Sequence, residues 1–498
     1  MAARPHSRGS AARERFVQAL AALAALACAG CASFGAEERI GGDSPVAAAA
    51  WITTGDQQRL LDPAPVRRTA SREAALITVD PAQRYQEMVG FGAALTDASA
   101  ILMRDHLTDA ARQALLRDLY GDGLGLGMLR LPIGASDFSV EHYTLDDVPP
   151  GREDRALTRF SMAPMRATGA LPIVQEMRAI NPELAIIASP WSAPAWMKTS
   201  GSLIGGRLRR EAYPAFAEYL RRYAQAMADE GAPLFALTIQ NEPHFEPANY
   251  PGMRMTPAER ATFIGEHLGP LLERSHLPVR ILEWDHNWDE WRAPMAVLAD
   301  PRAAPYVDGV AWHCYAGEVA AQSQVHEAYP AAETYFTECS GGEWDPAFGD
   351  ALLWNVNTLI IGATRNWARG VILWNLALDQ DHGPHLGGCG DCRGVVTIDS
   401  RTGEVTRNVE YYALAHASRF VRRGARRIGS QVSDAALSAV AFRNSDDGSL
   451  VLIVTNAATA GREVALQSPQ GDFALRLDAR SVATVVWGGR RAAAAPSN

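Results

Sequence analysis

The sequence predicts an α/β protein: a (β/α)8 TIM barrel with a fused all-β sandwich built from N- and C-terminal segments. Between residues 87 and 405, eight apolar strands alternate with helical segments, which is typical of a closed parallel barrel. From residue 406 to 490 the pattern changes to short strands separated by turns such as Asp-Asp-Gly, which indicates an all-β module. At 498 residues the chain is long enough for both parts.

The chain begins with a segment, residues 1–31, that resembles an export signal. Arginines precede a short apolar run from Val17 to Ala27, which is too short to span a bilayer comfortably. Small residues before Cys31 resemble a bacterial lipoprotein cleavage site. We therefore expect an exported protein, periplasmic or at the cell surface, and lipid attachment at Cys31, ordinary secretion and a retained anchor stay open as alternatives.

Two segments are expected to lie outside the folded domains. Residues 32–74 combine an alanine run with scattered prolines and show little periodicity, which favours a tether. Residues 491–498 are expected to form a tail.

Eight strands and the helices between them define the predicted barrel at 87–405. The helix over Ala212–Glu230 has apolar residues at helical spacing, and Thr108–Tyr120 ends at Gly121. Thr256-Pro257-Ala258-Glu259 is a capping box with proline at the first helical position. The expected strands are Met88–Leu95, Gly127–Pro132, Leu184–Pro190, Leu234–Gln240, Val279–Trp284, Gly309–His313, Thr334–Glu338 and Gly370–Asn375.

The all-β module is expected to take strands from both ends of the folded region. A lone strand within residues 75–86 precedes the barrel and is expected to pair with the C-terminal strands. Those strands are Leu437–Arg443, Leu450–Asn456, Arg462–Gln467, Phe473–Leu477 and Ser481–Trp487.

The strand ends carry the chemistry, because the active site of such a barrel lies where its strands end. Glu242 follows the fourth strand directly after Asn241, and Glu338 ends the seventh. Two carboxyl groups across a barrel mouth suit hydrolysis of a sugar bond, and their separation decides between retention and inversion. The amide of Asn241 is placed to hydrogen-bond a sugar hydroxyl more strongly in the transition state.

Other strand ends supply residues that suit the same cleft. Arg130 is expected to pair with the nucleophile and keep it ionised, and its alternative is a structural salt bridge. Trp191 and Trp374 are expected to contact the sugar ring, with barrel packing as the alternative. His313 and Tyr315 are expected to orient the nucleophile by hydrogen bonds, with a structural polar role as the alternative.

An ordered set of motifs resembles glycoside hydrolase family 30, in the branch that contains acid β-glucosidase (glucosylceramidase). The resemblance covers about residues 75–490. The motifs are Gly90-Phe91-Gly92-Ala93-Ala94-Leu95-Thr96-Asp97, Leu129-Arg130-Leu131-Pro132 with Ser136-Asp137-Phe138-Ser139, Ser189-Pro190-Trp191-Ser192, Gln240-Asn241-Glu242-Pro243, Trp312-His313-Cys314-Tyr315, Glu338-Cys339 and Trp374-Asn375-Leu376-Ala377-Leu378.

The resemblance implies a retaining β-glycosidase. We expect it to use no cofactor and no catalytic metal. The resemblance implies that Glu242 is the general acid/base and Glu338 the nucleophile. It also implies a set of residues that bind the terminal glucosyl unit. We expect Asn375 to bind substrate as well, because it lies at the same strand end as Trp374. The implied residues are Asp97, Trp191, Asn241 and Trp374.

The leading functional prediction is hydrolysis of β-glucosidic bonds of the β-glucosidase or glucosylceramidase type, with a β-glucoside or glucan as substrate. The alternative within the family is an endo-β-1,6-glucanase. The alternative from another class is a non-catalytic carbohydrate-binding surface lipoprotein, for which loss of Glu242 or Glu338 would be the signature. A formal net charge of −9 argues against general attraction to nucleic acid, and the sequence does not predict the oligomeric state.

The cysteines near these motifs are interpreted as zinc ligands, disulfide partners or free thiols. His382, His385, Cys389 and Cys392 have a spacing that zinc ligands can use. In an exported protein Cys389 and Cys392 more readily form a small disulfide, with free thiols as a further alternative. Cys314 and Cys339, on different barrel strands, are expected to be buried free thiols. Because Cys314 and the 382–392 loop depart from the vertebrate pattern, ceramide specificity does not follow from the resemblance.

Overall fold

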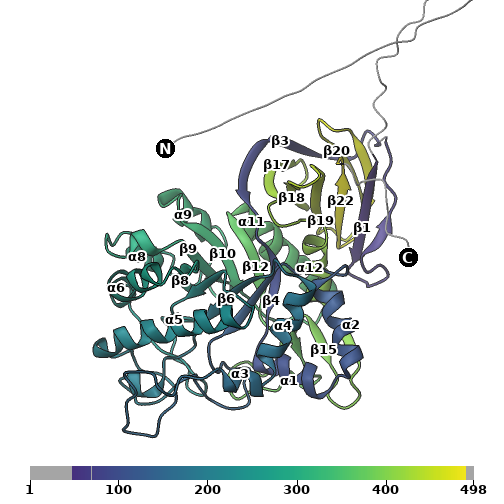
Figure 1. The fold of residues 1–498 in the computed structure, drawn as a ribbon. Helices are drawn as coiled ribbons and strands as arrows, with labels where there is room; N and C mark the ends of the chain where they lie inside the picture. Colours follow the sequence, from purple (N-terminus) through teal and green to yellow (C-terminus); the bar gives the residue numbers. More distant parts are fainter. Residues whose placement is uncertain (1–46, 69, 490–498) are drawn as a thin grey trace, which may run out of the picture. The chain divides into compact units, whose positions relative to one another are not determined.

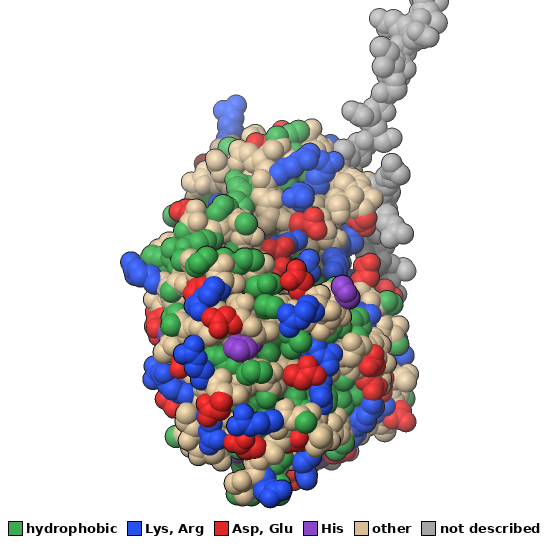
Figure 2. All heavy atoms as spheres, turned by 60° about the vertical axis from the view of Figure 1, so that its left-hand side comes forward, with side chains coloured by type: hydrophobic (Ala, Val, Ile, Leu, Met, Phe, Trp, Pro, Cys, Tyr) green, Lys and Arg blue, Asp and Glu red, His purple; other side chains and the backbone are tan. Residues whose placement is uncertain are grey.

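The computed structural model describes residues 47–68 and 70–489 (Figure 1). The predicted export signal at residues 1–31, with the lipid attachment at Cys31 that is one of its alternatives, and the predicted tail at 491–498 lie outside this range and stay predictions. Within it, the helices are too short or too polar to cross a membrane. On the face drawn in Figure 2, acidic and basic side chains are interspersed with apolar ones.

Eight parallel strands close into a barrel in the order β10-β12-β4-β5-β6-β7-β8-β9. Each overlaps one expected strand, so the predicted barrel is confirmed. The fifth strand runs past the expected Trp284 to Asn287 through an irregularity between Trp284 and His286. The strands are β4 (Gly90–Ala94), β5 (Met128–Pro132), β6 (Ala185–Ser189), β7 (Ala236–Thr238), β8 (Arg280–Asn287), β9 (Gly309–His313), β10 (Glu333–Glu338) and β12 (Ala368–Leu373).

Helices follow the barrel strands, and their ends match the sequence signals. The Thr108 side chain accepts a hydrogen bond from the Ala111 amide, and the helix it caps stops before Gly121. The capping box of Thr256 and Glu259 is present in full. The principal helices are α1 (Asp97–Asp105), α2 (Asp109–Tyr120), α4 (Ala170–Ile180), α5 (Tyr213–Asp229), α6 (Pro257–Phe263), α7 (Gly269–Arg274), α8 (Arg292–Leu298), α9 (Ala321–Ala328) and α10 (Phe348–Trp354).

The all-β domain contains nine hydrogen-bonded strands in the order β2-β1-β22-β19-β18-β17-β3-β20-β21. Buried side chains such as Ile52, Ile77, Leu452 and Leu475 form one apolar core within it. The strands are β1 (Ala48–Thr54), β2 (Asp62–Ala64), β3 (Ala75–Glu87), β17 (Arg426–Val432), β18 (Leu437–Arg443), β19 (Leu450–Asn456), β20 (Arg462–Gln467), β21 (Phe473–Leu477) and β22 (Ser481–Trp487).

The expected tether at residues 32–74 is wrong for its described part, because β1 and β2 belong to this sheet. All seven residues of β1 pair with β22, from Ala48 opposite Trp487 to Thr54 opposite Ser481. Ala50 and Ile52 point into the core of the domain. The alanine run hides this strand in the sequence, since alanine has a low strand propensity and gives no clear alternation.

The predicted boundary between the domains at residue 406 is also displaced, because a helix, α12 (Val409–Ser418), precedes β17. This helix is apolar on nearly all sides, which is typical of a buried helix. Its His416 contacts the hydroxyl groups of Thr484 and Thr53, each at 2.9 Å. Burial lowers the pKa of His416 to about 3, so a neutral imidazole joins α12 to the all-β domain.

Short strands in the loops that follow the barrel strands complete the fold. The loop after β10 carries β11 (Gly341–Gly342), which pairs with β14 (Cys392–Arg393) in the loop after β12. A second small sheet joins β13 (Ala377–Leu378), β15 (Val396–Ile398) and β16 (Val405–Arg407). The loops after the seventh and eighth barrel strands are thus connected by backbone hydrogen bonds.

Candidate active site

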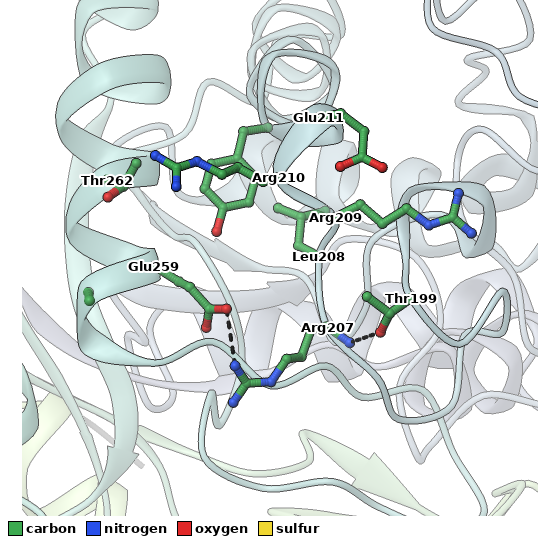
Figure 3. A pocket seen from close by; sticks show the side chains of 10 residues that line it. Thr199, Arg207, Leu208, Arg209, Arg210, Glu211, Glu259 and Thr262 are labelled. Atoms are coloured by element: carbon green, nitrogen blue, oxygen red, sulfur yellow. Dashed lines mark hydrogen bonds and ion pairs between the residues drawn. The ribbon is translucent and has the colours of Figure 1, made fainter.

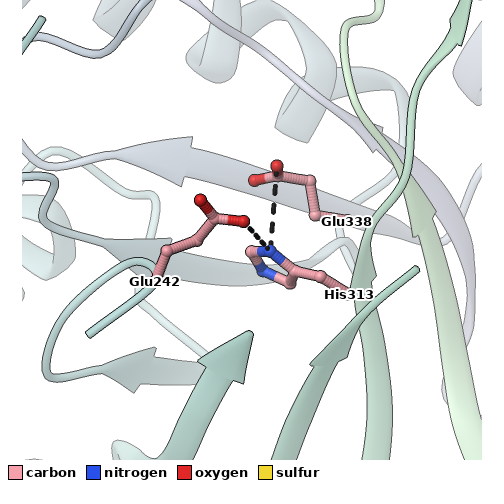
Figure 4. Close-up of side chains that lie close together, drawn as sticks. All are labelled: Glu242, His313 and Glu338. Carbon is pink, nitrogen blue, oxygen red and sulfur yellow. Dashed lines mark hydrogen bonds and ion pairs between the residues drawn. The ribbon is translucent and has the colours of Figure 1, made fainter. Parts of the chain in front are cut away.

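Glu242 and Glu338 meet at the C-terminal end of the barrel. Glu242 lies in the loop after β7 and Glu338 ends β10, the fourth and seventh barrel strands along the chain. Figure 4 shows both carboxylates directed toward His313 at the end of β9. The His313 Nδ1 atom lies 3.0 Å from Glu242 Oε1 and 3.8 Å from Glu338 Oε1. The structure therefore brings together the two carboxyl groups that the sequence singles out.

The gap between these carboxylates is narrow. One oxygen of Glu242, one oxygen of Glu338 and a ring nitrogen of His313 all lie within 4.8 Å of one another. A gap of about 6.5–9.5 Å would leave room for an attacking water, whereas about 5 Å suits direct attack by a carboxylate on the sugar. The geometry therefore fits the retaining arrangement.

Arg130 supports Glu338 from below the cleft. This residue is fully buried in β5, and its Nη1 donates to Glu338 Oε2. Its Nη2 donates to Asn241 Oδ1 at 2.7 Å and to Asp285 Oδ2 at 2.8 Å. Burial alone would lower the pKa of Arg130, but the carboxylates of Asp285 and Glu338 outweigh it and raise that pKa. With the Tyr315 hydroxyl donating to Glu338 Oε1 at 3.0 Å, each oxygen of Glu338 faces a donor.

Asp285 is a buried anion beneath the site, within β8, and it is not among the site residues predicted from the sequence. Burial would raise the pKa of Asp285, but Arg130 and His313 bring it well below its usual range. An ionised Asp285 therefore holds the side chains that contact both glutamates. Its hydrogen-bond donors are Arg130, Ser189, Thr238, His313 and Thr337.

His313 is a cation in this arrangement. Burial lowers its pKa, but the Glu338 carboxylate and hydrogen bonds to Asp285 and Glu242 raise the pKa to about 9. With both ring nitrogens protonated, Nδ1 donates to Glu242 and Nε2 donates to Asp285 at 3.0 Å. His313 thus links the acid/base candidate to the buried anion.

Glu242 has the environment of an acid. Burial is the main cause that raises the pKa of its carboxyl group, Glu338 adds to it, and His313 opposes it. A raised pKa is what a carboxyl needs to donate a proton near neutral pH. The backbone of Glu242 has a φ of 46°, in the left-handed region. Such conformations are concentrated at functional sites in non-glycine residues.

The carboxylates open into a cavity of about 610 Å³. Trp191 and Trp374 stack on each other in its wall with ring centroids 5.1 Å apart. The Arg130 guanidinium lies 4.9 Å from the Trp191 ring and 5.5 Å from the Trp374 ring. The predicted residues His313 and Arg130 are not among the described residues that line the cavity. The predicted residues that line the cavity are Trp191, Asn241, Glu242, Tyr315, Glu338 and Trp374.

Two predicted substrate-binding residues, Asp97 and Asn375, are not among the described residues that line the cavity. Asp97 is buried, and it accepts hydrogen bonds from Ser139 at 2.7 Å and Tyr143 at 3.1 Å. Asn375 is fully buried and accepts a hydrogen bond from Thr96 at 2.9 Å. The Asn375 Nδ2 atom is buried and has no hydrogen-bond partner among the described residues. The substrate-binding roles of Asp97 and Asn375 therefore stay predictions.

Asp137 is a cavity residue to which the sequence reading assigned no role. The residue is 8% exposed, and its Oδ1 atom has no hydrogen-bond partner among the described residues. Burial, reinforced by Glu338, raises the pKa of Asp137 to about 8. The signal for it was its place in the motif Ser136-Asp137-Phe138-Ser139, in the loop that follows the second barrel strand.

Both cysteine pairs near the site form disulfides. The expectation that Cys314 and Cys339 are free thiols is wrong: they bridge, with Cα atoms 5.5 Å apart. The reason is that β9 and β10 are neighbours in the closed barrel, so the two residues just after them come within bonding reach. Cys389 and Cys392 also bridge, which confirms the favoured disulfide over free thiols and zinc ligation.

Among the described residues, Glu242, His313 and Glu338 place ligand atoms close enough to share a cation. A cation there would have to displace the proton that His313 shares with Glu242. The donor set therefore fits acid–base chemistry better than a resident metal.

A second cavity, of about 620 Å³, lies between the loop that precedes α5 and helix α6 (Figure 3). Its Arg207 is paired with Glu259 at 3.1 Å, and the Arg207 amide donates to Thr199 at 2.9 Å. Glu259 also accepts the hydrogen bond that closes the α6 capping box. This carboxylate is thus used structurally, and the cavity suits acid–base chemistry less than the first.

Comparison with known families matches nearly the whole described chain. Residues 88–421 match the family described as "Glycosyl hydrolase family 30 TIM-barrel domain". Residues 424–485 match "Glycosyl hydrolase family 30 beta sandwich domain". The junction between the two matches lies after α12.

Individual relatives are similar along most of their length. The "Endo-1,6-beta-D-glucanase" of Neurospora crassa is 36% identical over 415 residues, 79% of this chain and 84% of the relative. The mouse "Lysosomal acid glucosylceramidase" is 28% identical over 451 residues, 83% of each chain. A solved endo-β1,6-glucanase structure superposes with a TM-score of 0.83 at 32% identity, covering 89% of this chain and 99% of that one.

Proposed function

This chain belongs to glycoside hydrolase family 30, and from that membership we propose that it is a retaining hydrolase of β-glucosidic bonds whose substrate is a β-1,6-linked glucan. The observation that carries the proposal is the pair Glu242 and Glu338, with carboxylate oxygens within 4.8 Å across one cavity. Their surroundings differ as the two roles require: Glu338 faces donors, and burial raises the pKa of Glu242.

The proposed reaction has two steps. Glu338 attacks the anomeric carbon while Glu242 protonates the departing oxygen, so the glycosidic bond breaks as a glycosyl ester forms. Water then attacks the same carbon, Glu242 takes its proton, and Glu338 leaves as a carboxylate. Two displacements at one carbon return the original β configuration.

Residues of the cavity wall would hold the sugar. Asp137, kept neutral by its raised pKa of about 8, is a hydrogen-bond donor for a sugar hydroxyl. Asn241 accepts from Arg130 through its amide oxygen, which leaves its amide nitrogen as a donor. Trp191 and Trp374 supply the apolar wall that sugar-binding cavities combine with a few polar groups.

The choice of a β-1,6-glucan rests on the relatives. Proteins named as endo-1,6-β-glucanases are 36–38% identical to this chain, and those named as glucosylceramidases are 27–30% identical. This supports the endo-β-1,6-glucanase alternative better than the glucosylceramidase-type activity that leads the sequence-based prediction. Because both glutamates are present and paired, a purely carbohydrate-binding lipoprotein is supported least. Export and attachment at Cys31 remain proposals.

The test compares three substrates with the purified chain: β-1,6-glucan, glucosylceramide and an aryl β-glucoside. We expect oligosaccharides from the glucan early in the reaction, and proton NMR of the first products to show the β anomer. A Glu338→Gln variant is the control for contaminating activity. Release of glucose from glucosylceramide without cleavage of the glucan would overturn the substrate, and an α-anomeric first product would overturn the mechanism.

A further inference from the structure

The disulfide between Cys314 and Cys339 is built into the catalytic constellation. Cys339 directly follows Glu338, and Cys314 stands between His313 and Tyr315. The residues on either side of Cys314 each contact a glutamate: His313 bonds Glu242 and Tyr315 bonds Glu338, both at 3.0 Å. The bridge therefore covalently connects the nucleophile's strand to the residues that orient both carboxylates.

The bridge begins where the hydrogen-bonded ladder ends. The parallel pairing of β9 with β10 runs from Gly309 opposite Glu333 to His313 opposite Glu338, with an irregularity just before the last pair. Cys314 and Cys339 are the next residue on each strand. Beyond this point β9 and β10 no longer pair through backbone hydrogen bonds. The disulfide therefore fixes the distance between the two segments that follow these strands.

Tyr315 shows why a restraint is needed there. The residue is 47% exposed at the cavity, and its backbone amide donates a hydrogen bond to Asn287 Oδ1 at 3.0 Å. An exposed side chain loses conformational entropy when a single hydrogen bond holds it in one rotamer. Cys339, by contrast, is almost fully buried, so the bridge anchors the chain beside Tyr315 to the packed interior.

We propose that the Cys314–Cys339 disulfide is a positioning element of the reaction. It fixes the position of the Tyr315 hydroxyl relative to the Glu338 carboxylate, so that the carboxylate is oriented for attack on the anomeric carbon. The inference rests on the proposed retaining mechanism. The inference assigns the bridge a role in the first chemical step, the attack by Glu338. A shift of about 1 Å in the position of a reacting group can lower the rate a hundredfold.

The chain offers a matched comparison in its second disulfide. Cys389 and Cys392 lie in the wall of the same cavity, in the loop whose β14 pairs with β11. Gly388 packs so closely on Asp137 that a side chain there would collide with it. This bridge therefore supports the sugar-binding wall, whereas the first supports the nucleophile.

The test uses 2-deoxy-2-fluoro-β-D-glucosyl fluoride, which reports the first displacement alone. The Glu338 carboxylate forms a bond to the anomeric carbon as the carbon–fluorine bond breaks, and fluoride leaves with the electron pair without a proton from Glu242. Cys314→Ala/Cys339→Ala is expected to lower the limiting rate of labelling by about tenfold or more, with inhibition by glucose nearly unchanged. Cys389→Ala/Cys392→Ala is expected chiefly to raise the reagent concentration needed for half the limiting rate.

A double-mutant cycle separates positioning from general loss of stability. If the bridge acts through Tyr315, adding Tyr315→Phe to the Cys314→Ala/Cys339→Ala variant costs less than it does alone. Should the alanine pair not fold, dithiothreitol supplies a second route on the folded protein. It gives two electrons and two protons to the bridge, leaving two thiols and its own cyclic disulfide, and labelling is then measured with the thiols located by mass spectrometry.

The outcomes are distinct. Labelling of a folded, glucose-binding Cys314→Ala/Cys339→Ala variant at the wild-type limiting rate would overturn the inference while leaving the proposed function intact. Failure of the wild-type protein to be labelled at all on Glu338 would overturn the retaining mechanism, and the inference with it.

Discussion

His313 donates a hydrogen bond to Glu242, with 3.0 Å between Nδ1 and Oε1, while its other nitrogen donates to the buried Asp285. A protonated imidazole is thereby held against the acid/base candidate. Glu338 raises the pKa of Glu242 and His313 lowers it. When Glu338 becomes a neutral ester its contribution disappears, so the pKa of Glu242 falls and the group is ready to act as the base of the second step.

Glu338→Gln should abolish turnover of a β-glucoside, by at least about 10³-fold, because the amide cannot form the glycosyl ester. Glu242→Gln should lose activity on the glucan by about 10²–10⁴-fold and retain far more on β-glucosyl fluoride, whose leaving group needs no proton. Activity is measured on both substrates, and circular dichroism checks that each variant folds. Near-normal turnover by Glu338→Gln would show that the nucleophile is elsewhere.

His313→Asn should shift the pH profile in a defined direction. The His313 cation lowers the pKa of Glu242, so its replacement by a neutral amide raises that pKa. The limb of the kcat/KM profile on which the acid loses its proton should therefore move to higher pH, and maximal activity should fall about tenfold as the orientation of Glu242 loosens. A limb that stays in place or moves to lower pH would contradict the coupling between these residues.

Arg130→Met should destabilise the fold, because it removes the buried guanidinium that pairs with both Asp285 and Glu338 and leaves His313 as the remaining cation beside them. Removing one partner of a buried pair costs about 3–5 kcal/mol. Arg401→Met is the matched control, since Arg401 is 71% exposed in its pair with Asp399 and solvent-exposed ion pairs contribute little to stability. Urea unfolding of both variants measures the difference. Equal losses would show that Arg130 does not act as the buried counter-ion.

The sequence could predict every barrel strand because apolar runs followed by polar strand ends repeat regularly along the chain. Glu242 and Glu338 could be placed for the same reason, since each ends such a run. The Cys314–Cys339 bridge could not be predicted, because the spatial order of strands around a barrel decides which loops meet. Asp137 was missed because it lies in a loop after its strand rather than at the strand end.

Asp137→Asn should be more stable than the wild type, by an amount that grows with pH. Burial raises the pKa of the Asp137 carboxyl to about 8, from its ordinary value of 3.8. Between these values the folded protein holds a proton that the unfolded chain releases, so the wild-type free energy of unfolding falls as pH rises from about 4 to 8. The Asp137→Asn variant has no carboxyl group at this position, so its free energy of unfolding does not show this decrease. Urea unfolding at pH 4, 6 and 8 should show that the difference in free energy of unfolding between variant and wild type grows with pH, to at least about 1 kcal/mol. A difference that stays constant with pH would contradict the prediction.

Trp344→Ala should weaken binding of the glucan beyond the reacting sugar. Trp344 is 55% exposed and lines the cavity beside the catalytic pair, so its flat face is available to a neighbouring glucosyl unit. Loss of an aromatic contact worth about 0.5–1.5 kcal/mol corresponds to an increase of up to about tenfold in KM. The increase should be larger for the glucan than for an aryl β-glucoside. Trp354→Ala is the matched control, because Trp354 is 42% exposed and lies outside the cavity lining. If both variants raise KM equally, Trp344 does not contact the substrate, and the leaving sugar must be bound by another part of the cavity wall.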